Sequence, residues 1–478
     1  MTTEHNDNNQ LPPDGGLSAP PRWLLWGVIG IFVLAIVGGA AGVWVFRDVL
    51  RPSQQQRVMD MFPFMRAFMR GGEALPTPEI QTTNANAAGD LLLTPFSFST
   101  AAPTATEEAA ATATVEPTVL PTALPTTAAS QPPAPTAAAV LPTPTPVTPV
   151  AVQVSSAITL PPANRLYGFT YTRQDWNNCG AANVTIALSY FGWTEEMSFA
   201  VSYLKTDRED KNVSPSEIVN FVNEQTGIRA IARIAGDIDL LRALLANNFP
   251  VTIETGYMFE GYDWIGHYRT LVAYDDLQQR FYIYDSFLGN GTSGEGITET
   301  YTALDENWRA FNRTFIVFYQ QEREAELAQI LGDLADPQLA AERALTVARE
   351  EAIENPQDSF AWFNMGTALT RLGLYEDAAT AYDQARRVQF PELPWRMLWY
   401  QFGMYEAYFN VGRYEDVLSL VDANLNNGGQ YVEETFYWQG RVYAAQGQSG
   451  QAADSFRRAL SQNSNFTAAR EALEALNA

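Results

Sequence analysis

The sequence predicts a multidomain protein that joins a single transmembrane helix, an α+β domain and an all-α helical-repeat domain. Three observations lead to this prediction. Residues 23–46 carry no charged side chain, and such a run is long enough to cross the hydrocarbon core of a bilayer. Residues 166–320 mix apolar runs of helical and of strand character. Residues 321–478 are rich in helix-forming stretches and contain glycines at similar spacings.

Composition limits the classes of function. A chain of 478 residues is long enough for two or three domains. Its formal net charge of -24 argues against a nucleic-acid partner, because phosphates need compensating Lys and Arg side chains. The single cysteine, Cys179, excludes an intrachain disulfide and says nothing about the redox compartment.

The N-terminal part is expected to anchor the protein in the cell membrane. Residues 1–22 are polar and rich in Pro, Gly and Asn, which predicts a disordered tail. Residues 23–46 are too long for the core of a signal peptide and predict one membrane-spanning helix. Tryptophans occupy the places where interfacial aromatic residues are expected, namely Trp23, Trp26 and Trp44.

Two features of this helix bear on partners and orientation. Gly38 and Gly42 form a small-xxx-small pair that would let two such helices pack as a homodimer, although ordinary glycine content of a membrane helix is the favoured explanation. Positive-inside counting alone would keep the C-terminal side in the cytoplasm, because three arginines follow the helix, Arg47, Arg51 and Arg57.

The segments that follow favour the opposite orientation. Residues 47–70 form a juxtamembrane segment whose Met, Phe and Arg pattern is compatible with the membrane surface. Residues 71–165 are dominated by Pro, Thr and Ala and cannot build a core, so a semi-extended linker is expected. Because such stalks usually hold domains off a cell surface, we expect the C-terminal domains to be extracytoplasmic.

A cysteine at the start of an apolar run is the first candidate for chemistry. Cys179 precedes the run from Ala181 to Phe191, which predicts a helix that ends at Gly192. A thiol at a helix N-terminus lies at the positive end of the helix dipole, which favours the nucleophilic thiolate. Gln174, upstream of the cysteine, would place a side-chain amide donor beside the sulfur.

The candidate base belongs to a predicted β-hairpin. The chain has two histidines, and His5 lies in the polar tail, so His267 is the histidine of the folded region. Residues 268–274 and 281–284 have strand patterns on either side of an Asp-Asp turn, and the second strand ends at Asp285. A hairpin of this length brings Asp285 back near His267, where a carboxylate can orient the imidazole and stabilise its cation.

These residues resemble those of the papain-like cysteine peptidases. More narrowly, a Gln before a Cys-Gly pair, followed by Gly266-His267-Tyr268, is similar to the bacteriocin-processing, double-glycine peptidase family over residues 166–320. The resemblance implies an α+β papain-like fold and peptide-bond hydrolysis. It assigns a nucleophile, a base, an orienting acid and an oxyanion-hole donor, in that order Cys179, His267, Asp285 and Gln174.

Departures from the family leave alternatives open. Asp285 is followed by Ser286 where many relatives have Pro, and no transporter modules accompany the domain, so the substrate is open beyond a peptide or protein. The main alternative is a catalytically inactive scaffold that binds protein partners, because a lone Cys in an apolar helix is often only a buried hydrophobe. A thiol amidase or acyltransferase is the third, since the same triad serves those reactions.

Neither a metal nor another cofactor is expected. One cysteine and one folded histidine cannot form a metal cluster unless carboxylates supply all the ligands. Residues 289–294 match a glycine-rich nucleotide fingerprint, but the residues after them do not predict the helix that such a site requires. The aromatic residues between positions 257 and 265 either line a peptide-binding cleft or pack over the hairpin.

The last third of the chain repeats. Three glycines, Gly373, Gly412 and Gly447, each precede a helix-forming stretch at spacings of 39 and 35 residues. Small and aromatic residues agree around the first and third, namely Gly366, Ala378, Tyr382 and Ala385 against Gly440, Ala452, Phe456 and Ala459. This pattern resembles tetratricopeptide repeats, in which small residues allow close approach of two helices. We therefore expect leucine at Gly373 or Gly447 to overpack the helices.

The resemblance to tetratricopeptide repeats implies a surface that binds a protein partner or a peptide substrate, because repeat arrays present concave faces. The alternative is that residues 321–478 serve only as a structural spacer or a dimerisation surface.

Overall fold

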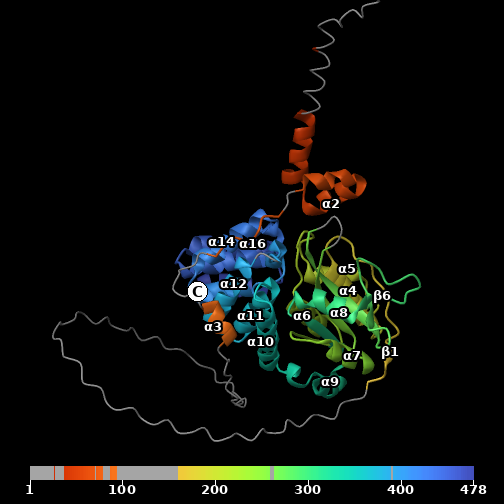
Figure 1. Ribbon diagram of the computed structural model, residues 1–478. Coiled ribbons are helices and arrows are strands. Elements are labelled where there is room, and N and C mark those ends of the chain that lie inside the picture. The colour runs from red at the N-terminus through yellow and green to blue at the C-terminus, as the bar shows by residue number, and fades with distance from the viewer. Residues whose placement is uncertain are drawn as a thin grey trace, which may run out of the picture. The chain divides into compact units, whose positions relative to one another are not determined.

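A seven-stranded antiparallel sheet forms the centre of the region between residues 160 and 320 in the computed structural model (Figure 1). The structure describes residues 26, 37–69, 72–78, 87–93, 160–258, 263–388 and 391–477. Six strands follow the order β2-β7-β3-β4-β5-β6, and β1 pairs with the end of β4. The strands are β1 (Ala163–Arg165), β2 (Arg229–Arg233), β3 (Val251–Tyr257), β4 (Ile265–Asp275), β5 (Arg280–Tyr284), β6 (Ile297–Thr300) and β7 (Phe315–Tyr319).

Helices cover the sheet, and alternating strand residues face different helices. Tyr268, Ile316 and Phe318 belong to the apolar core formed with α4, α5 and α6. Phe315, the residue of β7 before Ile316, points to the opposite face of the sheet. It lies with Trp308 of α8 against Gly236. This two-residue alternation is what a strand buried on both faces requires. The helices are α4 (Cys179–Ser189), α5 (Met197–Leu204), α6 (Pro215–Gln225), α7 (Ile238–Ala246) and α8 (Tyr301–Arg309).

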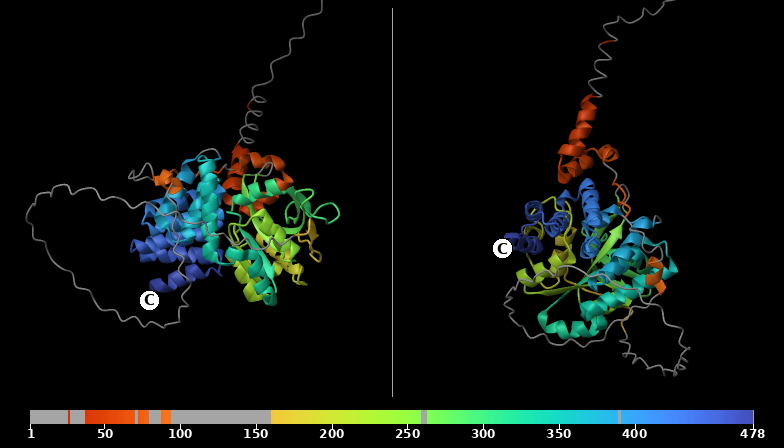
Figure 2. Two further views of the ribbon diagram at one scale, coloured as in Figure 1. Left: turned by 60° about the horizontal axis from the view of Figure 1, so that its bottom comes forward. Right: turned by 90° about the vertical axis from the view of Figure 1, so that its left-hand side faces the viewer.

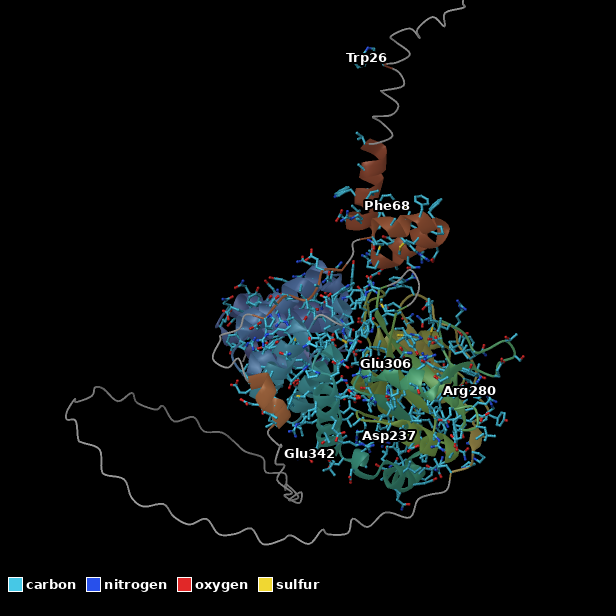
Figure 3. All side chains as sticks on the ribbon, viewed as in Figure 1. Trp26, Phe68, Asp237, Arg280, Glu306 and Glu342 are labelled. Atoms are coloured by element: carbon cyan, nitrogen blue, oxygen red, sulfur yellow. The ribbon has the colours of Figure 1, made fainter. Side chains whose placement is uncertain are left out.

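Local sequence signals explain where these helices begin. Ser214 caps α6 and forms a capping box with Glu217, with Pro215 as the first helical residue. Asp237, labelled in Figure 3, caps α7 by accepting a hydrogen bond from Leu240 N. Its other carboxylate oxygen pairs with Arg343, which belongs to the helical region after the sheet.

The predicted hairpin is present as β4 and β5. The strands are joined by a turn over residues 276–279. Their register shifts between Leu271 and Ala273, which inserts a β-bulge into β4. Asp285 follows β5 directly and pairs with Gly289 through two backbone hydrogen bonds. The end of the hairpin is thereby fixed beside the strand that carries His267.

Residues beyond β7 form a helical region, drawn in teal to blue in Figure 2, and in it α11 packs on α12 and α15 on α16. Gly366 lies against the ring of Tyr382, and Gly440 lies against Phe456 in the same way, since a Cβ on either glycine would come within 2.7 Å of the ring. The elements are η3 (Gln321–Arg323), α9 (Glu324–Leu331), η4 (Gly332–Ala335), α10 (Pro337–Glu354), α11 (Ser359–Arg371), α12 (Tyr375–Arg387), η5 (Trp395–Trp399), α13 (Gly403–Asn410), α14 (Tyr414–Asn426), η6 (Gly429–Tyr431), α15 (Glu433–Ala445), α16 (Ser449–Gln462) and α17 (Thr467–Asn477).

The reason predicted for the turn glycines is wrong. A Cβ on Gly373 or Gly447 would meet nothing within 4 Å, so these glycines do not mark a close helix approach. Their backbone φ angles are 72° and 75°, a left-handed conformation that L-residues with a Cβ adopt only at a cost. They therefore end one helix and redirect the chain into the next.

The membrane prediction is contradicted. Among the described residues, no helix is long and apolar enough to cross a bilayer, which overturns the single transmembrane helix over 23–46 and the single-pass membrane localisation. The described end of that segment is helical at 37–44 and continues as the π-helix η1 (Val45–Val49), where Arg47 and Asp48 end the uncharged run. Residues 37–49 rise only about 20 Å, against a hydrocarbon core of about 30 Å. Residues 1–25 and 27–36 lie outside the described residues.

Part of the predicted linker is packed. After α2 (Pro52–Met61) and η2 (Pro63–Phe68), residues 72–78 lie along the helical region, where Asn427 exchanges two hydrogen bonds with the Glu73 backbone. The short helix α3 (Ala87–Leu93) contacts α10 and α12 and buries Leu91. Apolar and carbonyl groups in these two stretches find partners that composition alone does not reveal. Residues 94–159 lie outside the described residues.

Candidate active site

Cys179 is the first residue of α4, and its position is held from both sides. Before it, Asn177 adopts a left-handed backbone with φ of 57°. One turn after it, Asn183 Nδ2 donates to the Cys179 carbonyl at 3.0 Å and to the Tyr268 carbonyl at 2.7 Å. The same amide group therefore ties the start of α4 to β4, the strand that carries His267. The Cys179 side chain is half-buried.

His267 and Asp285 form a buried pair. His267 Nε2 lies 2.8 Å from Asp285 Oδ1, and neither side chain is more than 3% exposed. The same Oδ1 accepts hydrogen bonds from the backbone N–H groups of Phe287 and Leu288 at 2.9 and 2.8 Å. The imidazole is fixed through Nε2, which leaves Nδ1 for the hydrogen bond with the Cys179 thiol. The hairpin and the start of α4 thus bring together Cys179, His267 and Asp285, three of the four residues that the sequence singles out.

Arg269 holds the second oxygen of Asp285. Its Nε donates to Asp285 Oδ2 at 3.0 Å, and its side chain is 3% exposed. Arg269 also pairs with Glu299 and lies 4.9 Å from the ring centroid of Tyr257. His267 and Arg269 are separated by one residue of β4, so their side chains lie on the same face of the strand. Both carboxylate oxygens of Asp285 are therefore fixed.

The electrostatics of the three residues reinforce one another. Burial by itself raises the pKa of the Cys179 thiol, but the hydrogen bond and the charge of His267 outweigh it and lower that pKa below its ordinary value. Burial by itself lowers the pKa of His267, but the Asp285 carboxylate outweighs it and raises that pKa to about 10. Burial opposes ionisation of Asp285, yet His267 and Arg269 keep its pKa well below the usual range. The arrangement favours a thiolate–imidazolium pair at neutral pH.

Gln174 is fixed by the residue after Asp285. Ser286 Oγ donates to Gln174 Oε1 at 2.7 Å, and Gln174 N donates to the Ser286 carbonyl at 3.0 Å. Asn183 Nδ2 also donates to Ser286 Oγ at 3.0 Å. With its oxygen held in this way, the Gln174 amide has its NH₂ group as the donor that remains for a ligand. Gln174 is not among the described residues that line the cavity at Cys179.

The cavity beside Cys179 is small and is closed partly by the helical region. Its volume is about 10 Å³, enough for about one water molecule. Besides Cys179 and His267, its lining includes Lys211, Glu254 and Tyr400. Tyr400 follows η5, so a residue outside the α+β core contributes to the site.

The aromatic residue before His267 packs rather than remaining free for a ligand. Trp264 stacks on Phe311 with ring centroids 5.7 Å apart and also contacts Tyr400. Residues 259–262 of the same loop lie outside the described residues. For Trp264 the packing alternative is therefore the one observed.

Several residues at the site were missed from the sequence. Arg269 could have been found from its two-residue spacing to His267 on one strand face. Asn183 could have been found from its position one helical turn after Cys179. Nothing in the local sequence points to Lys205, whose Nζ donates to the Asn177 carbonyl at 2.8 Å and whose charge helps to lower the pKa of Cys179. Tyr400 is equally distant in sequence.

The α+β region is the part of the chain that resembles known proteins. Residues 166–316 match the model of the Peptidase_C39 like family. The match supports a papain-like, cysteine peptidase-like fold. A crystal structure from Bacillus anthracis, described as a C39-like peptidase, is similar to 33% of this chain and 98% of that chain, with 14% identity and a TM-score of 0.28. No curated protein matches the chain. The family match ends before α9, so the tetratricopeptide assignment of the helical region stays a prediction.

Proposed function

We propose that the chain is a cysteine peptidase that hydrolyses peptide bonds through an acyl-enzyme. The observation that supports this most directly is the chain of contacts from the Cys179 thiol to His267 and from His267 Nε2 to Asp285. A structural cysteine needs no such partner, whereas a nucleophile needs a base that is itself held in orientation. The family match over residues 166–316 supports the same reaction class.

In the proposed reaction, the Cys179 thiolate attacks the carbonyl carbon of the peptide bond and forms a C–S bond. The negative charge that develops on the carbonyl oxygen is met by the Cys179 backbone N–H and by the Gln174 side-chain amide. His267, protonated at the start, gives its proton to the leaving amine as the C–N bond breaks. It then takes a proton from water, which attacks the thioester and releases the carboxylic acid and the thiolate.

The experiment uses the full chain and a peptide mixture of varied sequence, with new termini identified by mass spectrometry. We expect cleavage by the wild-type protein and none by Cys179→Ala, which removes the sulfur at little cost in packing. A covalent acyl adduct on Cys179 should accumulate when activated esters replace peptides. If both proteins give the same products and no adduct forms, the proposal fails.

A second candidate, a catalytically inactive binding module, is favoured by one observation. A cavity of about 10 Å³ admits no peptide unless a lining group such as Tyr400 or Lys211 moves. Under the peptidase proposal, the helical region both binds the protein substrate or partner and sets access to Cys179. Peptides that bind without being cleaved, in the assay above, would favour the binding module.

A further inference from the structure

Three glutamates from distant parts of the chain meet at the junction between α6 and the helical region. Glu217 lies in the first turn of α6, and Glu433 and Glu434 form the first turn of α15. One carboxylate oxygen of each lies within 4.8 Å of the others. Asn463 Nδ2 bridges two of them, because it donates to Glu217 Oε1 and to Glu433 Oε1, both at 2.8 Å.

Two of these carboxylates have oxygens without a partner. Glu433 is 1% exposed and Glu434 is 8% exposed. Among the described residues, neither Glu433 Oε2 nor Glu434 Oε2 has a donor in hydrogen-bond geometry, although the Asn212 side chain lies close to Glu434. A buried carboxylate oxygen that no protein donor contacts is costly, and a cation or a proton removes that cost.

The surroundings of the cluster add negative rather than positive charge. Glu433 has Asp210, Glu434 and Glu217 as negatively charged neighbours, and Asp210 is itself fully buried. The N-termini of α6 and α15 each supply about half a positive charge. Set against the three carboxylates of the cluster alone, this leaves about two negative charges, which one divalent cation would neutralise.

We propose that Glu217, Glu433 and Glu434 bind a calcium ion that links the α+β core to the helical region. The donors are all oxygens, which suit a hard cation rather than zinc or copper. Calcium accepts oxygen ligands at about 2.4 Å in flexible geometry, whereas magnesium demands a near-ideal octahedron at about 2.1 Å, so carboxylates from two separate helices suit calcium better. This site is separate from Cys179 and does not depend on the proposed peptidase activity.

The ion would stabilise one wall of the active-site cavity, because the residues just before α6 line that cavity. Glu217 Oε2 accepts from Ser214 N at 2.7 Å, and the preceding residues Lys211, Asn212 and Val213 line the cavity beside Cys179. Lys211 N in turn donates to the Tyr431 carbonyl, just before α15, at 3.0 Å. Calcium would therefore hold this wall of the cavity against the helical region.

The test is a titration of the full chain with CaCl₂ after treatment with EDTA. We expect calorimetry to show one ion bound per chain. The melting temperature should rise by about 4 °C when the calcium concentration is about 100-fold above the dissociation constant. Glu434→Gln keeps the size of the side chain and should weaken binding at least tenfold. Glu415→Gln is the matched control, because Glu415 is the exposed second residue of α14 and should leave binding unchanged.

Two results would overturn the proposal. In the first, the wild-type protein shows no heat of binding and no shift of its unfolding temperature with calcium, and Glu434→Gln is more stable than wild type in EDTA. Protons would then neutralise the carboxylates. The other is magnesium binding as tightly as calcium, which would exclude the calcium assignment. If Glu434→Gln fails to fold, Glu433→Gln and the wild-type titration decide the question.

Discussion

Replacing Asp285 by asparagine should move the reactivity of Cys179 to higher pH. The substitution keeps the shape of the side chain but removes the charge that raises the pKa of His267 to about 10. A carboxylate in contact with a cation shifts a pKa by roughly 1–3 units, so His267 in the variant should lose its proton between about pH 7 and pH 9. The Cys179 thiolate then loses its cationic partner, and the thiol pKa rises toward its ordinary value.

The assay is the rate of alkylation by iodoacetamide as a function of pH. Cys179 is the only cysteine of the chain, so the gain in mass reports on this site alone. Each unit by which the thiol pKa rises lowers the thiolate fraction tenfold below that pKa, and we expect Asp285→Asn to react about tenfold more slowly than wild type at about pH 8, where His267 of the variant has lost its proton.

The control is Asp239→Asn, which removes the same charge from a side chain that is 84% exposed. It should reproduce the wild-type profile, and thermal unfolding of each protein shows that the fold is retained. Superimposable pH profiles for Asp285→Asn and wild type would refute the reasoning, because Asp285 would then have no influence on the thiol.

Three further outcomes follow from the same structure. Ser286→Ala removes the donor to Gln174 Oε1, so kcat for peptide hydrolysis should fall roughly tenfold with little change in KM; a change confined to KM would contradict a role in the transition state. Gly440→Ala places a Cβ 2.5 Å from Phe456 and should lower the free energy of unfolding by about 1–3 kcal/mol in urea, whereas Gly447→Ala, strained only by its φ of 75°, should cost about 1 kcal/mol. The raised pKa of His267 contributes stability that is complete below about pH 6.5 and is lost as pH rises through about 10, so the melting temperature should fall between about pH 6.5 and pH 10, and over a narrower range in Asp285→Asn.

The sequence singles out the candidate triad because its signals are local and rare. Cys179 is followed by an apolar run that predicts a helix, and the length of one hairpin is enough to place Asp285 beside His267. Ser286 was visible as a departure from the family, but its hydrogen bonds to Gln174 and Asn183 depend on where three separate elements meet. Pattern gives the order of elements, whereas such contacts require the packed structure.

Two failures of sequence reasoning have different physical causes. The membrane helix is inferred from hydropathy over residues 23–46, whereas no helix among the described residues is both long and apolar enough to cross a bilayer. The close helix approach expected at Gly447 is wrong because glycine serves two different purposes in this region. At Gly440 the missing Cβ makes room for Phe456, and at Gly447 it permits a left-handed turn.

Gly266 shows why the helical region belongs to the description of the active site. The resemblance to the peptidase family includes Gly266 in the motif around His267 but does not explain why this residue is glycine. In the structure, a Cβ at this position would come within 2.6 Å of Phe311 and 3.1 Å of Tyr400. Tyr400 therefore approaches the backbone next to the candidate base as closely as glycine allows, and it lines the same cavity of about 10 Å³ as Cys179. A peptide reaches the thiol only if the lining moves, so the segment that carries Tyr400 is as much a part of the cleft as the strand that carries His267.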